Sequence, residues 1–351
     1  MKKTIFVVDD NATNLSVAEK TLESQYLVIT FCSAAKMFEI FEKVKPDLIL
    51  LDIEMPEMNG FETIKRLKAD KESRDIPVIF LTVSTNSDDE AYGIQLGAVD
   101  FIVKPFSEPV LLQRIKNHLD IDELIHERTA LLQERTKQLI KLQNGIVYTL
   151  ADIVENRDAN TGGHIDRTTV YCKVLLDAMI EQGLYTDEIR SWDVDSVVSS
   201  ARLHDLGKIS IPDSILNKPD KLTPEEFIVI KTHSLAGEHL IDNMIERTGN
   251  AEFLHNAKMF AAYHHEQWNG TGYPYGLNEK EIPLQGRIMA IVDVYDALTS
   301  ERPYKKAFTS NEAFEIMDKE STTHFDPKIA SVFCDIKDKI EMEQAKLKIL
   351  N

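Results

Sequence analysis

The stretch LILLDIEMPEMNG, residues 48–60, decides how the first third of the chain folds. It begins with four apolar residues, and Asp52 follows them directly. A short apolar run with polar boundaries is typical of a strand that is buried on both faces of a parallel sheet. We therefore predict a buried strand at 48–51, with Asp52 at its carboxyl end.

Four further apolar runs lie before and after this strand. They are TIFVV (4–8), LVITF (27–31), VIFL (78–81) and FIV (101–103). The segments between the runs carry apolar residues at helical spacing, so strands alternate with helices. Five such units predict an α/β fold with a doubly wound, flavodoxin-like parallel sheet. In a sheet of this kind the functional site lies at the carboxyl ends of the strands.

Polar residues stand where this rule expects them, at the ends of four predicted strands. They are Asp9, Asp10, Asp52, Thr82 and Lys104. Three carboxylates at one sheet edge repel one another unless a cation joins them, and hard oxygen ligands suit Mg²⁺. Lys104 and Thr82 can contact phosphoryl oxygens. The alternative, that these residues only cap strand ends, does not explain why all four ends fit one chemistry.

Composition limits the class of the protein and its partners. A chain of 351 residues with 43% hydrophobic residues predicts two globular domains or slightly more. The formal net charge of −18 disfavours a nucleic acid polymer as partner. Three widely spaced cysteines fit a reducing compartment. Without a signal peptide or a long apolar run, we expect a cytoplasmic protein with no membrane contact.

Residues 121–145 are predicted to form a helical linker. Apolar residues recur every seven positions along this stretch and beyond it, at Ile125, Leu132, Leu139, Ile146 and Ile153. Such a repeat favours a coiled coil, so we expect a homodimer through this helix. The alternative is a helix that packs on its own domain.

Seven polar side chains interrupt the helical, apolar pattern that begins near residue 146. They are His164, His204, Asp205, His233, His264, His265 and Asp293. Adjacent residues of a helix diverge by about 100°, so a pair such as His204-Asp205 meets only through an object between them. A metal ion is such an object, and an aspartate can bridge two. The ligand types predict two transition-metal ions, Fe, Mn or similar, with Lys208 beside them.

Two neighbouring ions are the arrangement that hydrolyses phosphate esters, which predicts a hydrolase. A single histidine is more often an ordinary core or surface residue than a ligand. We assign the remaining histidines to that group: His118, His126, His239, His255 and His324.

The segments VVDD, LLDIEMPEMNGFE, FLTVS and GAVDFIVKPF resemble the receiver domain of two-component response regulators over residues 1–120. The resemblance implies that Asp52 accepts a phosphoryl group from a sensor histidine kinase. It implies that Mg²⁺ is held by Asp9, Asp10, Asp52 and the backbone carbonyl of Glu54. Thr82 and Phe101 match the pair of residues that responds to phosphorylation, and Lys104 matches the residue that contacts the phosphoryl group.

The segments HDLGKISIPDSILNKP, HSLAG, HHEQWNGTGYPYGL, DVYDALTSERPYKKA and HFDPKI resemble the HD-GYP family over residues 146–340. The resemblance implies an all-α fold and hydrolysis of cyclic di-GMP to pGpG, and in many members to GMP. It implies one metal held by His164, His204, Asp205 and Asp293. It implies a second held by His233, His264 and His265, with Asp205 bridging and catalytic. Further implied substrate contacts are Lys208, Tyr273, Arg302 and Lys305.

Two alternatives stay open on the sequence. The substrate can be another cyclic dinucleotide such as cyclic GMP-AMP, or the second domain can bind the dinucleotide without cutting it. Asn160 stands where many members of the family have a glutamate, which argues against a third ion. Asn160 or Thr161 is instead a candidate cap for the helix that carries His164.

Overall fold

The computed structural model describes residues 2–41, 43–83, 87–158, 163–249, 251–301 and 306–350. The chain divides into two compact units, residues 1–137 and 138–351. None of the helices in the described ranges combines enough length with enough apolar character to cross a lipid bilayer.

The first unit contains the predicted parallel sheet. Its strands are β1 (Thr4–Val8), β2 (Leu27–Phe31), β3 (Leu48–Asp52), β4 (Val78–Thr82) and β5 (Asp100–Val103). They follow one another in the order β2-β1-β3-β4-β5, and every neighbouring pair is parallel. The doubly wound fold expected from the sequence is confirmed, with Asp52 as the last residue of the central strand.

Helices cover both faces of this sheet because alternate strand residues point to opposite sides. They are α1 (Ala12–Leu22), α2 (Ala34–Phe41), α3 (Gly60–Ala69), α4 (Ser87–Gln95) and the start of α5 (Glu108–Glu155). In β3, Ile49 and Leu51 belong to one apolar cluster, and Leu48 and Leu50 belong to the other. The polar residues Asp9, Asp52 and Thr82 at the carboxyl ends of the strands are buried but belong to neither apolar cluster.

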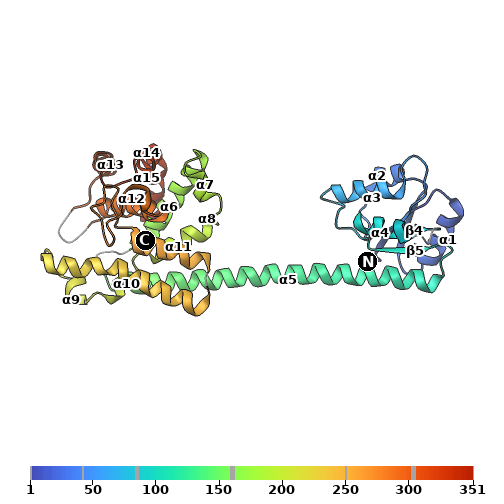
Figure 1. Ribbon diagram of the computed structural model, residues 1–351, viewed down its shortest axis with the longest axis horizontal. Helices are drawn as coiled ribbons and strands as arrows, with labels where there is room; N and C mark the ends of the chain where they lie inside the picture. The colour runs from blue at the N-terminus through green and yellow to red at the C-terminus, as the bar shows by residue number, and fades with distance from the viewer. Residues whose placement is uncertain are drawn as a thin grey trace. The chain divides into compact units, whose positions relative to one another are not determined.

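Helix α5 runs as one helix from the first unit into the second (Figure 1). Near its start Leu111 and Ile115 are buried under the sheet, and near its end Val147 and Val154 are buried in the second unit. The predicted linker, 121–145, lies inside this helix. The five apolar residues that recur every seven positions are all exposed, by 50–67%.

The second unit is helical, as predicted. Its elements are α6 (His164–Glu181), α7 (Thr186–Ile189), α8 (Val194–Ser200), η1 (Ala201–Leu203), η2 (Leu206–Ser210), α9 (Asp213–Leu216), α10 (Pro224–Thr248), α11 (Glu252–Tyr263), η3 (Glu279–Glu281), α12 (Leu284–Thr299), α13 (Ser310–Lys319), α14 (Pro327–Asp335) and α15 (Lys337–Leu350). Within its described residues, β-pairing is limited to one bridge between Asn269 and Asn278. Helix α12 is apolar around most of its circumference and is buried at the centre of the largest core cluster.

Candidate functional sites

Seven predicted ligands of the second unit come from separate elements and converge on one place. His164 begins α6, His233 lies in α10 and Asp293 lies in α12. The other four occupy turns: His204 and Asp205 stand between η1 and η2, and His264 and His265 follow α11. Five of the seven are buried, His265 is half-buried, and Asp293 keeps about a fifth of its side chain exposed.

The expectation that both ligand pairs lie within α-helices was wrong. His204 and Asp205 join two short 3-10 helices, and His264 is the C-cap residue of α11. For His204 and Asp205 the reason is the close packing of η2 against α10. Gly207 approaches the backbone of His233 so closely that a Cβ atom there would lie 1.9 Å from its carbonyl oxygen. The tighter turn permits this approach.

Asp205 lies between two groups of histidines, with one oxygen toward each. Its Oδ2 lies 3.8 Å from His164 Nε2 and 3.4 Å from His204 Nε2. Its Oδ1 lies 3.6 Å from His233 Nε2 and 3.8 Å from His264 Nε2. A carboxylate in this position can contribute one oxygen to each of two cations.

Asp293 completes the first group. Its Oδ1 lies 3.5 Å from His164 Nε2, and the His164 and His204 Nε2 atoms are 3.2 Å apart. His164, His204 and Asp205 offer ligand atoms that all lie within 4.8 Å of one another. This spacing can accommodate a metal ion.

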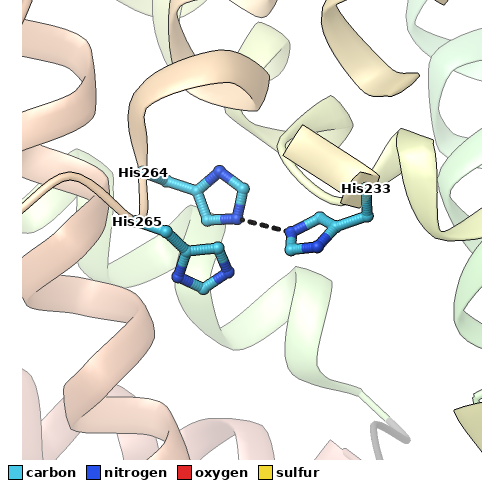
Figure 2. Close-up of side chains that lie close together, drawn as sticks. All are labelled: His233, His264 and His265. Atoms are coloured by element: carbon cyan, nitrogen blue, oxygen red, sulfur yellow. Dashed lines mark hydrogen bonds between the residues drawn. The ribbon is translucent and has the colours of Figure 1, made fainter. Parts of the chain in front are cut away.

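The second group consists of His233, His264 and His265. Figure 2 shows the three rings pointing toward one another, His233 from one side and the two neighbouring histidines from the other. The Nε2 atoms of His233 and His264 are 3.3 Å apart, and the three ligand atoms lie within 4.8 Å. The structure thus brings together the residues of each predicted ligand set.

The histidine rings are oriented as metal ligands are. The Nδ1 atoms of His204, His233 and His264 lie 2.7–2.9 Å from the backbone oxygens of Ala201, Ile230 and Phe260. An Nδ1–H that donates to such an oxygen leaves Nε2 with its lone pair toward the centre. These histidines therefore fit a metal centre.

Burial favours the neutral, ligating form of the second group. It lowers the pKa of His233 and holds the pKa of His264 and His265 well below the usual range. Burial would also lower the pKa of His204, but the charge of Asp205 outweighs it and raises that pKa. A cation held by His204 and Asp205 would take the place of that proton.

A carboxylate that the sequence pattern did not predict supports His164. Asp296 is 2% exposed and lies 2.7 Å from His164 Nδ1 through Oδ2, and Arg167 Nε donates to its other oxygen at 2.6 Å. A carboxylate behind a ligating histidine fixes the ring and raises its basicity. Its only signal in the sequence is its place three residues after Asp293.

Lys208 lies beside the centre, as expected, but it is paired. Its Nζ lies 2.8 Å from Asp205 Oδ2 and 3.2 Å from Asp158 Oδ2. Burial would raise the pKa of Asp205, but Lys208 and His204 hold it well below its usual value. Burial would lower the pKa of Lys208, but Asp205 and Asp158 raise it. Lys208 is therefore a fixed positive charge next to Asp205.

The loop that contains Gly272-Tyr273-Pro274 is held against the second group. The Tyr273 ring stacks on the His265 ring, with centroids 4.7 Å apart. Buried Glu266 accepts hydrogen bonds from the backbone N–H groups of Tyr275, Gly276 and Leu277 at 2.7–3.2 Å. The sequence pattern assigns no role to Glu266, but in the structure its hydrogen bonds hold the backbone of this loop in place.

A cavity of about 330 Å³ opens beside the second group. Its lining consists of His264, His265, Gln267, Tyr273, Asp293, Val294, Ala297, Leu298 and His324. Most of the wall from α12 is apolar, whereas Gln267 and His324 offer polar atoms. His324 was assigned to the ordinary histidines, so its position here was missed.

Three predicted residues of this site lie outside the described residues: Asn160, Arg302 and Lys305. Thr161 lies outside them as well. The predicted cap for α6 therefore falls outside the described residues. The N-cap residue of α6 is Gly163, whose left-handed φ of 72° suits a glycine.

The carboxyl edge of the sheet in the first unit gathers the other predicted site. Asp9, Asp10 and Asp52 offer oxygens within 4.8 Å of one another. Lys104 Nζ lies 2.6 Å from Asp9 Oδ2 and 2.8 Å from Asp52 Oδ1. Burial raises the pKa of Asp52, although Lys104 opposes that rise. The cluster can hold a hard cation.

The remaining predicted residues of this edge are placed around the cluster. Thr82 ends β4 and is buried, and Glu54 is exposed two residues after β3. Phe101 is 8% exposed, and its ring packs on Phe80 with centroids 5.3 Å apart. Phe101 therefore points into the core rather than into solvent.

Comparisons with known proteins match each of the two units to a family. Residues 5–116 match the response regulator receiver domain family, and residues 124–329 match the HD domain family. The HD domain match and the two histidine clusters indicate divalent metal binding.

Three relatives show how far the likeness extends. A protein of Vibrio cholerae named probable cyclic di-GMP phosphodiesterase is 40% identical over 94% of this chain and 77% of its own length. The cyclic di-GMP phosphodiesterase response regulator RpfG of Xanthomonas campestris is 31% identical over 97% of this chain and 89% of its own. The 3'3'-cGAMP-specific phosphodiesterase 2 of Vibrio cholerae is 37% identical over 57% of this chain and 35% of its own. The chain therefore belongs to the family of response regulators that join a receiver domain to an HD domain.

Proposed function

We propose that this protein is a response regulator that hydrolyses cyclic di-GMP at a binuclear metal centre under the control of phosphorylation at Asp52. One observation carries the proposal: Asp205 presents one oxygen to His164 and His204 and the other to His233 and His264. A bridging carboxylate between two imidazole groups is the arrangement of a two-metal hydrolase.

The seven ligands would hold the ions in two sets that share Asp205. His164, His204 and Asp293 hold the first ion, and the second set is His233, His264 and His265. Imidazole and carboxylate ligands suit Fe, Mn or a similar metal better than a soft metal ion that prefers thiolate ligands. Two such ions supply an activated water and stabilise charge on the phosphoryl oxygens.

Side chains around the centre bind and orient the substrate. Lys208 adds a positive charge that favours an oxyanion beside Asp205. The cavity beside His265 takes one nucleobase, with apolar contacts from α12 and polar atoms from Gln267 and His324. Tyr273, already stacked on His265, forms part of the same wall. Arg302 and Lys305 stay predicted phosphate contacts.

The substrate assignment follows the relatives that match the whole chain. The two such relatives described above are named for cyclic di-GMP and cover 94% and 97% of this chain, whereas the cGAMP-specific relative described above covers 57%. The products are pGpG, GMP or both. A neutral amide at position 160 argues against a third ion.

In the first unit, Asp52 accepts the phosphoryl group, with Mg²⁺ held by Asp9, Asp10 and Asp52. Lys104 already spans Asp9 and Asp52 and would neutralise a phosphoryl oxygen. The Mg²⁺ contact of the Glu54 carbonyl and the responses of Thr82 and Phe101 stay predictions. So do the sensor kinase and the cytoplasmic location.

Product analysis tests this function. Protein loaded with Mn²⁺ or Fe²⁺ is incubated with cyclic di-GMP, with and without beryllofluoride and Mg²⁺, and the products are separated by chromatography. We expect linear pGpG or GMP, at a rate that beryllofluoride changes in the wild type but not in Asp52→Asn. Intact substrate under every metal condition would rule out the proposed hydrolysis. A competition assay with cyclic GMP-AMP decides which dinucleotide is preferred.

We also propose that the chain forms a homodimer through α5. The repeat Ile125, Leu132 and Leu139 presents an exposed apolar stripe to solvent at the spacing of a coiled-coil seam. A two-stranded coiled coil also needs a second apolar row three residues after the first, and in this chain that row is interrupted by Arg128 and Arg135. An apolar stripe at this spacing fits a second copy of the same helix.

Light scattering tests the dimer. The double variant Leu132→Asp with Leu139→Asp places charges in the seam, so its mass should fall to that of one chain. The matched control is Ala130→Asp with Gln133→Asp, which adds the same charge to exposed positions of the helix away from the stripe. An unchanged mass in the first variant contradicts the dimer through this helix.

A further inference from the structure

The C-terminal end of α5 and the turn that follows it, residues 156–158, contact two segments that lie beside Asp205. Residues 155–158 reach the first turn of α6 on one side and the η2 segment on the other. The first of these segments carries His164, and the second follows Asp205 directly. The same helix begins at Glu108 in the first unit.

Glu155 caps α6 from outside that helix. Its Oε1 accepts hydrogen bonds from the backbone N–H of His164 at 2.5 Å and of Ile165 at 3.4 Å. The first N–H groups of a helix have no partner within it, and a side chain at the N-cap position usually accepts from them. Here the N-cap residue is Gly163, which has no side chain to do so. The carboxylate of α5 therefore holds the residue that carries the first metal ligand.

Arg157 holds the segment on the other side of Asp205. Its guanidinium donates to the backbone oxygens of Ile209 at 2.6 Å and Ile211 at 3.2 Å, and to Asp213 at 2.7 Å. The side chain of Asn217 donates back to the Arg157 carbonyl at 2.8 Å. Four hydrogen bonds thus tie Arg157, two residues after the end of α5, to η2 and the segment that follows it.

Asp158 reaches the centre through Lys208. Lys208 Nζ donates to Asp158 Oδ2 at 3.2 Å and to Asp205 Oδ2 at 2.8 Å. The lysine is thus shared between the end of α5 and the bridging carboxylate. A displacement of Asp158 changes where this charge stands relative to Asp205.

We propose that Glu155, Arg157 and Asp158 form a coupling clamp, a set of positioning residues through which α5 sets the placement of His164 relative to Asp205. Because α5 is continuous, a rotation or shift of the helix begun at the receiver sheet arrives at the clamp. A misplacement of about 1 Å at a reacting centre can cost about a hundredfold in rate. The inference rests on the proposed metal centre for its effect on catalysis.

Hydrogen–deuterium exchange of the full-length protein tests the clamp without relying on turnover. The proteins are the wild type, Glu155→Ala, Glu155→Gln and the control Asp152→Ala, an exposed acid one turn earlier on α5. Each is measured with Mg²⁺ alone and with Mg²⁺ plus beryllofluoride, which occupies Asp52. The peptide that covers 163–168 contains His164 and Ile165, the two residues whose backbone N–H groups donate hydrogen bonds to Glu155.

We expect Glu155→Ala to raise exchange in this peptide by about tenfold or more, the equivalent of one lost charge-assisted hydrogen bond. Beryllofluoride should change exchange in the wild type and the control, but not in Glu155→Ala. Glu155→Gln keeps an accepting oxygen and should recover most of the response. A simple structural cap would raise exchange yet leave the beryllofluoride response intact, and that result overturns the proposal.

A second variant covers the case in which Glu155→Ala does not fold. Asp158→Asn removes the charge beside Lys208, and it should weaken the beryllofluoride response in the peptide that covers 204–210. An unchanged response there overturns the clamp as well. Failure of the proposed function looks different, because the wild type would then leave cyclic di-GMP intact while the exchange pattern still responds.

Discussion

Asp205→Ala is expected to lower kcat for cyclic di-GMP hydrolysis by about a thousandfold or more. Among the described residues that were predicted as ligands, Asp205 is the one whose two oxygens face both histidine groups, so its loss would remove a ligand from each proposed ion at once. Metal stabilisation of a phosphoryl transition state contributes several kcal/mol, and each 1.4 kcal/mol is about tenfold in rate. Steady-state kinetics with saturating Mn²⁺ measure the effect.

Asp205→Asn separates the bridge from simple charge loss. The amide keeps one oxygen for one group and turns a nitrogen toward the other, so we expect one ion to be lost and the activity with it. Asp195→Ala is the control, because Asp195 is exposed by 89% and lies in α8. Activity within about tenfold of the wild type in Asp205→Ala would show that the bridging role is wrong.

Gly207→Ala should reduce the free energy of unfolding of the second unit by about 3 kcal/mol. A Cβ atom at this position would lie 1.9 Å from the His233 carbonyl oxygen and 2.4 Å from the Gly237 nitrogen. Both are backbone atoms of α10, so no side chain can move aside. The added methyl group forces η2 away from α10, and this also separates Asp205 from His233.

Gly145→Ala is the matched control for that variant. Gly145 lies within α5, and a Cβ atom there would meet nothing within 4 Å. Alanine in a helix interior is favoured over glycine by up to about 1 kcal/mol, so this variant should be slightly more stable than the wild type. Urea unfolding measures both changes. Equal stability of the two variants would contradict the close packing of η2 on α10.

The parallel sheet was predictable from sequence because its signals are local. Each buried strand is a short apolar run, and the rule that sites lie at the carboxyl ends of strands correctly predicts that Asp9, Asp52 and Lys104 share one edge. The convergence of the seven predicted ligands of the second unit could be foreseen in the same way, because they are polar side chains in apolar surroundings. Local pattern and chemical type were sufficient for both.

The residues that support the ligands were not predictable in this way. Asp296 contacts His164 across 132 positions of sequence, and Glu155 caps a helix to which it does not belong. Nothing in the local pattern distinguishes these acids from solvent-exposed ones, because their partners are set by how the helices pack. The turns at His204 and His264 were missed for the same reason, since the packing of Gly207 decides the turn at His204.

Anomalous X-ray scattering from crystals grown with Mn²⁺ tests the central claim most directly. We predict two peaks roughly 4 Å apart, one near His164, His204 and Asp293 and one near His233, His264 and His265, with an oxygen of Asp205 bound to each. A single peak, or none within reach of these seven side chains, would contradict the binuclear centre.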